Sequence, residues 1–207
     1  MEEYNNNLPE ETEEVENNEE VEIIEEDIDE PKKSIVREIL DWLLCIVIAV
    51  AIALVIRNYV FTLVNVSGPS MNPTLNDKDI LYVNRLFYTP KAGDIIIFKP
   101  KASPETPYVK RIIATEGQIV ELDYTTGGVI VDGKPIDEDY ISEPIENFGN
   151  MEYPYTVPED HVFAMGDNRN NSLDSRMAVV GAVSEESIIG KAIFRIFPIG
   201  DFGSLYE

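Results

Sequence analysis

The sequence of 207 residues contains one cysteine and one histidine, and both counts limit its chemistry. Because Cys45 is the only cysteine, a disulfide within one chain and a cysteine metal cluster are excluded. Because His161 is the only histidine, a metal site with several histidine ligands is excluded too. A catalytic triad of serine, histidine and aspartate would have to use His161.

Basic residues are also scarce, since 16 Lys and Arg oppose 39 Asp and Glu and give a formal net charge of −23. The first 30 residues hold 15 of the acidic residues and no Lys or Arg, which leaves −8 for the remainder. We expect no nucleic-acid partner for such an acidic chain, because contacts with phosphates need Lys and Arg. Low hydrophobicity and charge of one sign predict a disordered acidic tail over residues 1–34.

An unbroken apolar run extends from Trp42 to Ile56. Its 15 residues would cover roughly 22 Å as a helix, and flanking apolar residues extend it toward the ~30 Å of a bilayer core. We therefore expect one transmembrane helix within residues 35–61. A buried core helix is the weaker alternative because the run is apolar on all sides. A cleavable signal peptide fits badly, since the preceding segment is long and acidic.

Positive charge around this run predicts its orientation. Lys32, Lys33 and Arg37 precede the apolar run, whereas Arg57 alone follows it closely. Basic residues concentrate on the cytoplasmic side of membrane helices. We therefore expect a single-pass membrane protein with a cytoplasmic N-terminus and an extracytoplasmic domain after about Phe61.

After the apolar run, short β-like segments alternate with turns rich in glycine and proline. The expected strands are residues 80–83, 94–98, 108–113, 118–122, 129–131, 161–165, 179–183 and 188–197. Asp132-Gly133 is a hairpin turn signal, and residues 136–160 are typical of an irregular loop. The pattern predicts a mainly β, antiparallel domain over residues 62–200, with residues 201–207 as a C-terminal tail.

Ser70 stands between two proline-containing turns, in the stretch from Ser67 to Leu75. Such punctuation favours a fixed turn that presents its hydroxyl. A nucleophile needs this placement, with a backbone N–H nearby for a developing oxyanion. A polar turn serine without chemistry is the simpler alternative.

A nucleophilic serine needs a base, and His161 and Lys110 are the candidates. His161 begins a strand-like segment, which is typical of a surface histidine. Period-two alternation places Lys110 on one face with Tyr108 and Ile112, so an inward Lys110 would be desolvated and its pKa lowered. On spacing alone, an exposed edge-strand lysine is an equal alternative. Arg111 would point the other way, where a carboxylate could pair with it.

A third polar motif runs from Gly166 to Arg176 and packs two acids, two arginines and two serines into eleven residues. Asx-turn residues alone could explain part of this density. A hydroxyl in this motif could hold Lys110 in its rotamer, and an acid could pair with Arg111.

Together, Ser70-Met71-Asn72-Pro73-Thr74, Tyr108-Val109-Lys110-Arg111 and Gly166 to Arg176 resemble bacterial type I signal peptidase, a membrane-anchored endopeptidase with a Ser/Lys dyad. The resemblance covers residues 35–200 and leaves out the acidic tail. It implies a nucleophile at Ser70, a general base at Lys110 and a hydroxyl at Ser172 that orients Lys110. The supporting residues implied are Arg111, Asp167, Asp174 and Arg176, which form ion pairs, and Met71, which packs beside the nucleophile.

Gly68 departs from the Gram-negative pattern, in which a serine at this position donates to the oxyanion. The motif here resembles Gram-positive members, and the oxyanion hole would use the Ser70 backbone N–H with a water. The resemblance further implies two antiparallel sheet regions, with a reduced cap over residues 115–160. It implies secretory preproteins as substrates, cut after small-x-small motifs such as Ala-x-Ala through an acyl-enzyme. Its other implications are the lipid bilayer as a partner, proximity to the secretion translocon, and no cofactor.

Two rival interpretations remain open from the sequence. A self-cleaving repressor shares the fold and the Ser/Lys chemistry, but it would need a DNA-binding domain where the apolar run stands. A membrane-anchored binding module with an inactive site would not need Ser70 and Lys110 within hydrogen-bond distance.

Overall fold

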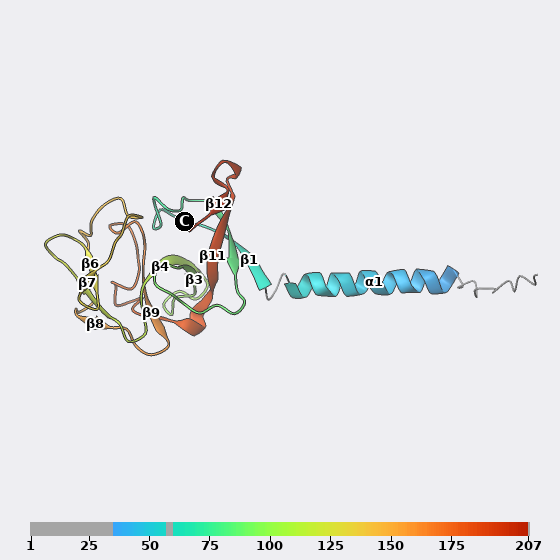
Figure 1. Cartoon of the computed structure of the whole chain (residues 1–207), viewed down its shortest axis with the longest axis horizontal. Coiled ribbons are helices and arrows are strands. Elements are labelled where there is room, and N and C mark those ends of the chain that lie inside the picture. The colour runs from blue at the N-terminus through green and yellow to red at the C-terminus, as the bar shows by residue number, and fades with distance from the viewer. Residues whose placement is uncertain (1–34, 57–59, 207) are drawn as a thin grey trace, which may run out of the picture. The chain divides into compact units, whose positions relative to one another are not determined.

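The computed structural model describes residues 35–56 and 60–206, shown in Figure 1. The tail predicted over residues 1–34 lies outside them. Within the described residues, one long helix precedes a domain built from short strands, and no other α-helix is present. The prediction of a mainly β, antiparallel domain after one apolar helix is confirmed.

Helix α1 (Ile35–Val55) contains 21 residues, all of them exposed. At 1.5 Å per residue it is roughly 32 Å long, which is enough to cross a ~30 Å hydrocarbon core. The predicted segment ended at Phe61, the residue that begins strand β1 and pairs with Asn84. Ile56 and Val60, on either side of residues 57–59, have π-helical backbone.

The β domain contains two antiparallel sheets. The larger one has the order β1-β2-β11-β3-β4-β9-β10, with β12 paired to β11. Its strands are β1 (Phe61–Asn65), β2 (Ile80–Asn84), β3 (Ile95–Phe98), β4 (Tyr108–Thr115), β9 (His161–Met165), β10 (Val183–Ser184), β11 (Ile188–Phe197) and β12 (Gly203–Ser204). The smaller sheet has the order β7-β6-β5-β8 and contains β5 (Ile119–Leu122), β6 (Val129–Val131), β7 (Lys134–Pro135) and β8 (Tyr155–Thr156). The range predicted as a reduced cap, residues 115–160, contains this whole smaller sheet.

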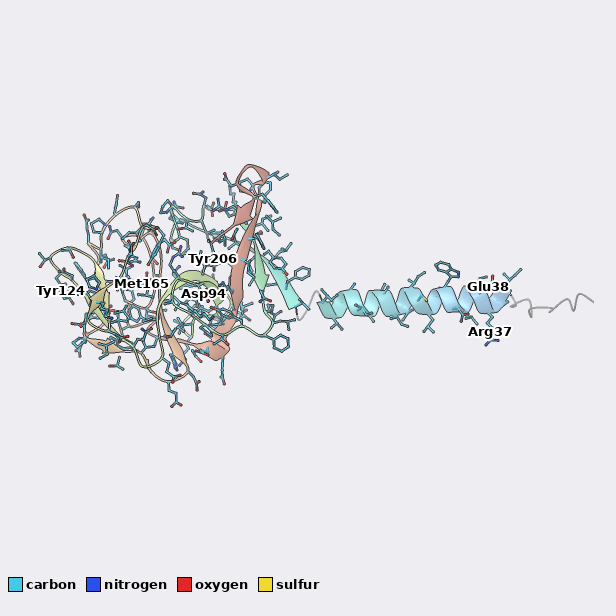
Figure 2. All side chains as sticks on the ribbon, in the orientation of Figure 1. Arg37, Glu38, Asp94, Tyr124, Met165 and Tyr206 are labelled. Carbon is cyan, nitrogen blue, oxygen red and sulfur yellow. The ribbon has the colours of Figure 1, made fainter. Side chains whose placement is uncertain are left out.

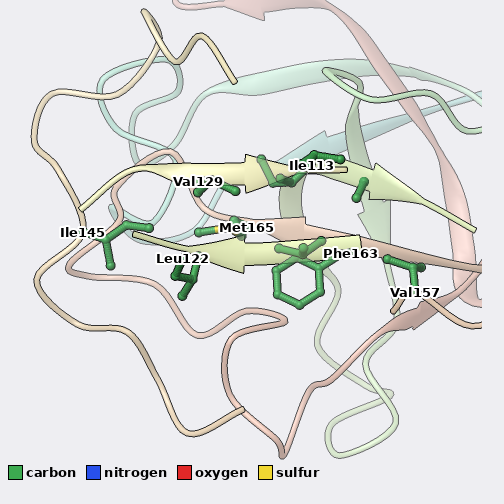
Figure 3. Packing of buried hydrophobic residues seen from close by; sticks show 10 residues of the cluster. Ile113, Leu122, Val129, Ile145, Val157, Phe163 and Met165 are labelled. Atoms are coloured by element: carbon green, nitrogen blue, oxygen red, sulfur yellow. The ribbon is translucent and has the colours of Figure 1, made fainter. Parts of the chain in front are cut away.

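Buried apolar side chains join the two sheets. Figure 3 shows the cluster, in which Ile113, Phe163 and Met165 of the larger sheet pack against Leu122 and Val129 of the smaller one. A second cluster lies beneath the Ser70 turn and includes Met71, Leu75, Leu81, Val83, Ile95, Ile97, Val109 and Ala192. Alternation along β3 and β4 supplies both sheet faces with apolar residues, so nearly all of β4 is buried. The middle of β4 is therefore a place where a charged side chain loses its water.

The predicted turn at Asp132-Gly133 is confirmed. Both residues have positive φ, 51° and 74°, and they connect Val131 to its partner Lys134. This is the geometry of a two-residue hairpin turn, which right-twisted strands favour.

Two sequence predictions near the C-terminus were wrong. The predicted strand at residues 179–183 is mostly a turn closed by Val180 N–H donating to Met177 C=O, and only Val183 enters β10. Residues 201–206 are not a free tail, because β12 pairs with β11. Tyr206, labelled close to Asp94 in Figure 2, accepts a 2.8 Å hydrogen bond from Ile95 N–H and donates one to Ala192 C=O. Tyr206 therefore belongs to the fold and contacts both β3 and β11.

Candidate active site

Ser70 lies in a turn that its neighbours hold firmly. Met71 and Leu75 are fully buried, and Leu75 N–H donates to Met71 C=O at 2.8 Å. Gly68 has φ +82°, a left-handed conformation that glycine adopts without strain. With Met71 anchored in the core, Ser70 stays partly exposed at the surface of the turn.

The segment after β9 supports this turn from the other side. Asn168 donates its backbone N–H to Ser70 C=O at 3.1 Å and its side-chain amide to Pro69 C=O at 3.1 Å. At Gly166, a Cβ atom would lie 2.4 Å from Ser70 C=O and 2.2 Å from Ser172 Oγ. Only glycine permits this approach, so Gly166 allows the third motif to pack directly on the Ser70 backbone.

Lys110 reaches Ser70 from the middle of β4. Its side chain is buried, with the residue 4% exposed, and Nζ lies 2.8 Å from Ser70 Oγ and 2.8 Å from Val109 C=O. The Tyr108 ring lies 5.4 Å from Nζ, as expected for two residues on one face of a strand. The structure therefore joins the first two motifs through one hydrogen bond.

Burial lowers the pKa of Lys110 from 10.5 to about 8. Desolvation is the main cause, and Arg176 acts in the same direction. The sequence interpretation placed only neutral groups around this amine, and that was incomplete. Asp174 and Asp167 both lie near enough to raise the pKa of Lys110, but desolvation outweighs them.

Arg111 points to the opposite face of β4 and binds Asp167 through two hydrogen bonds, of 2.9 and 2.7 Å. Its third donor group reaches Gly93 C=O at 3.0 Å. Thr74, four residues after Ser70, donates to the same Asp167 carboxylate at 2.5 Å. The pair therefore connects β4, the Ser70 turn and the third motif.

Asp174 and Arg176 form the second buried ion pair, with distances of 2.9 and 2.8 Å. Gly166 N–H also donates to Asp174 at 3.0 Å, which closes the third motif on itself. Arg176 and these hydrogen bonds keep the pKa of Asp174 below its usual value despite its burial. Ser172 Oγ is buried close to Gly166, but the described residues include no hydrogen bond from it to Lys110 Nζ.

His161 begins β9, and its Nδ1 lies 2.7 Å from the carbonyl oxygen of Glu159. It is absent from the residues that line the cleft at Ser70. This placement agrees with the surface position expected for it.

A cleft of about 210 Å³ opens beside Ser70 and Lys110. The end of β1 and the start of β4 provide its two walls, and four positions in sheet order separate these strands, so the larger sheet curls around the cleft. Its lining consists of Asn65, Val66, Ser67, Ser70, Thr106, Pro107, Tyr108, Val109, Lys110 and Leu173. Sequence reasoning missed Val66 and Leu173, and their only signal was an apolar side chain next to a motif serine. Among the described residues no cluster of three or more His, Cys, Asp or Glu side chains could hold a metal ion.

Comparison with known proteins adds independent findings. The family model described as "Signal peptidase, peptidase S26" matches residues 39–197. The chain is 40% identical over 173 residues to "Signal peptidase I P" of Bacillus subtilis subsp. natto, covering 79% of this chain and 91% of that protein. It is 39% identical over 170 residues to "Probable signal peptidase I-1" of Synechocystis, covering 77% and 83% respectively. A signal peptidase I crystal structure from Enterococcus faecalis matches at 30% identity and a TM-score of 0.42, over 50% of this chain and 97% of that one. The chain therefore belongs to the signal peptidase family, peptidase S26, and is a serine peptidase.

Proposed function

We propose that this protein is a membrane-anchored endopeptidase that removes N-terminal signal peptides from secretory preproteins, cutting after small-x-small motifs such as Ala-x-Ala. The observation that carries the proposal is the 2.8 Å contact between Ser70 Oγ and the buried Lys110 Nζ at the floor of a cleft. A serine is activated in this way when a neighbouring base is within hydrogen-bond reach and has a lowered pKa.

In the proposed mechanism, neutral Lys110 accepts the Ser70 proton while Oγ attacks the scissile carbonyl carbon. The tetrahedral intermediate collapses to an acyl-enzyme as protonated Lys110 returns the proton to the leaving amine. Neutral Lys110 then removes a proton from a water, whose oxygen attacks the ester carbonyl carbon. As the bond to Oγ breaks, protonated Lys110 returns this proton to Ser70, which releases the carboxylic acid product and restores the free enzyme. The complete reaction breaks one peptide bond and consumes one water, and its steps need no cofactor.

The Ser70 backbone N–H is the oxyanion donor in this proposal. Gly68 N–H is already engaged, because it donates to Asp77 at 2.9 Å. With glycine at this position no side-chain hydroxyl is available there, so a water would complete the site. Removing one oxyanion donor typically costs 10²- to 10³-fold in kcat, so the missing hydroxyl matters.

The remaining predicted residues receive supporting roles. Arg111 and Asp167 hold the Ser70 turn against β4, and Asp174 and Arg176 shape the third motif. Met71 anchors the nucleophile in the core. Ser172 would limit the rotamers of Lys110 from its buried place beside Gly166.

The cleft supports selection of small side chains. Its lining includes the apolar side chains of Val66 and Leu173 and the ring of Tyr108, which suit the apolar alanine side chains of an Ala-x-Ala site.

Helix α1 is the proposed anchor, with the N-terminus cytoplasmic and the β domain outside, close to the secretion translocon. Its length and composition suit a membrane span. The self-cleaving repressor is disfavoured because α1 occupies the place of a DNA-binding domain. The inactive binding module is disfavoured because Ser70 and Lys110 lie within hydrogen-bond distance.

The test is cleavage of a preprotein carrying an Ala-x-Ala site by the full-length protein in detergent micelles or vesicles. Ser70→Ala should abolish cleavage, while Ser142→Ala, at an exposed serine outside the cleft, should cleave normally. Replacing the alanine before the scissile bond by tryptophan should block cleavage by the unmodified enzyme. Normal turnover by folded Ser70→Ala would overturn the proposal.

A further inference from the structure

A five-residue segment of the β7–β8 connection, residues 137–141, lies against the ion pairs behind Ser70; we name it the strap. Ile141 N–H donates to Glu138 C=O at 3.1 Å and closes a turn. Asp137 and Asp139 are exposed, whereas Glu138 and Tyr140 are partly buried, so the side chains alternate between solvent and the protein. The strap therefore presents one carboxylate and one aromatic ring inward.

Both inward side chains contact arginines of the site. The Tyr140 ring centre lies 4.0 Å from the Arg111 guanidinium carbon and 5.8 Å from that of Arg169. Glu138 pairs with Arg169 at 2.5 Å and accepts a 3.2 Å hydrogen bond from the Tyr140 hydroxyl. A guanidinium over an aromatic face is attracted by the ring quadrupole, most strongly where water is excluded.

The buried guanidinium of Arg169 depends on its ion pair with Glu138 of the strap. The Arg169 side chain is fully buried, and among the described residues Glu138 is the carboxylate that lies within ion-pair distance of it. Its Nε donates to Gly166 C=O at 3.0 Å. Leaving a buried charge without its partner is costly, so the strap and the Gly166 segment depend on each other.

These contacts continue to the nucleophile. Arg111 binds Asp167, and Arg169 binds the carbonyl oxygen of Gly166. Asn168, which follows Asp167 in the chain, donates its backbone N–H to the Ser70 carbonyl oxygen. Three contacts in succession therefore connect the strap to Ser70, although the strap comes from the region of the smaller sheet. No strap residue lines the cleft.

We propose that Glu138 and Tyr140 are positioning residues of the active site: they clamp Arg111 and Arg169, and through them fix the Ser70 turn against Lys110. This inference rests on the proposed function. Because the strap acts behind the nucleophile and not on the substrate walls, its loss should lower kcat and leave KM unchanged. A misplacement of about 1 Å at a reacting group can cost up to ~10²-fold in rate.

The experiment compares Tyr140→Leu, Tyr140→Phe and Glu138→Gln in the full-length protein, with a preprotein substrate and at a temperature where circular dichroism shows each variant folded. Tyr140→Leu keeps apolar bulk without the aromatic face and should lower kcat about tenfold, equal to about 1.4 kcal/mol, with KM within twofold. Tyr140→Phe keeps the face and should retain kcat within about threefold. Glu138→Gln should lower kcat similarly to Tyr140→Leu.

Two matched controls should retain kcat. Asp139→Asn removes an exposed acid from the same strap, and Tyr124→Leu removes an exposed tyrosine that packs on Phe148 in the same region. A role in stability alone would lower the unfolding temperature of Tyr140→Leu but leave kcat unchanged, and that result overturns the inference. Should Tyr140→Leu not fold, unchanged kcat in Glu138→Gln overturns it equally. Active Ser70→Ala would instead refute the proposed function, so the two failures are distinguishable.

Discussion

The pH dependence of catalysis follows from the environment of Lys110. In the proposed mechanism only neutral Lys110 can accept the Ser70 proton, and burial lowers its pKa from 10.5 to about 8. With a pKa of about 8, that fraction is about 10% at pH 7 and about 90% at pH 9. We therefore expect kcat/KM for an Ala-x-Ala preprotein to rise about tenfold over this interval and then level off. A lysine with an ordinary pKa would give a rise of roughly 100-fold without a plateau.

The same burial affects stability. Below pH 8 the ammonium is charged in both states, and burying it opposes folding by roughly 3 kcal/mol, from the difference between 10.5 and about 8. Between pH 8 and 10.5 the folded protein is neutral while the unfolded chain still binds the proton, so this cost disappears as pH rises. Relative to Lys110→Met, the unfolding free energy of the wild type should therefore increase by roughly 3 kcal/mol across that window.

Urea unfolding of both full-length proteins in micelles, followed by circular dichroism at several pH values, measures this difference. Buried tyrosines such as Tyr88 and Tyr206, whose pKa values are raised by desolvation, are common to both proteins and cancel. Unfolding free energies that stay parallel from pH 8 to 10.5 would refute the desolvation argument. A large loss of turnover in folded His161→Ala would refute Lys110 as the base. So would activity in Lys110→Arg, whose guanidinium stays protonated.

Three further outcomes test other parts of the structure. Gly166→Ala should destabilise the protein by about 1–3 kcal/mol and reduce kcat, because the new Cβ would overlap Ser172 Oγ and Ser70 C=O; unchanged thermal unfolding would contradict this packing. Tyr206→Phe should cost about 1–3 kcal/mol in urea unfolding, since Ile95 N–H and Ala192 C=O lose their partner, whereas Tyr124→Phe should cost almost nothing. Protease added to intact protoplasts should digest the β domain and spare an epitope in residues 1–34, and the reverse result would contradict the predicted orientation.

Periodicity predicted most strands because their signals are local. The segments at residues 80–83, 129–131 and 161–165 show runs of β-branched or aromatic residues bounded by turns, and each became a strand. Residues 179–183 have the same local composition, but their backbone closes a turn on Met177. A local pattern carries no information about which partner strand is available, so this strand was predicted wrongly.

Residues of the candidate site could be predicted where the chemistry requires one particular residue type. They could not be predicted where a residue matters only because of its tertiary contacts. Ser70, Lys110 and the two ion pairs occur in motifs with specific order and spacing. Glu138, Tyr140 and Tyr206 occur in segments without a motif, and their importance comes from neighbours 29 to 111 residues away in sequence, Arg111 among them. Long-range contacts of this kind leave no periodic signal in a single sequence.

Two carboxylates near Lys110 oppose the lowering of its pKa, and ion pairs with arginines limit their effect. Asp167 and Asp174 both lie near the amine, and a free carboxylate at either place would favour the ammonium form. Each is instead bound through two hydrogen bonds by an arginine, Arg111 or Arg176, and further hydrogen bonds come from Thr74 and Gly166. The carboxylate charges are thereby largely compensated, and desolvation decides the pKa of Lys110. Replacing either arginine would leave an uncompensated acid beside the amine, raise its pKa and move the acidic limb of activity upward. In the proposed mechanism, the two arginines would therefore act on catalysis through charge as well as through position.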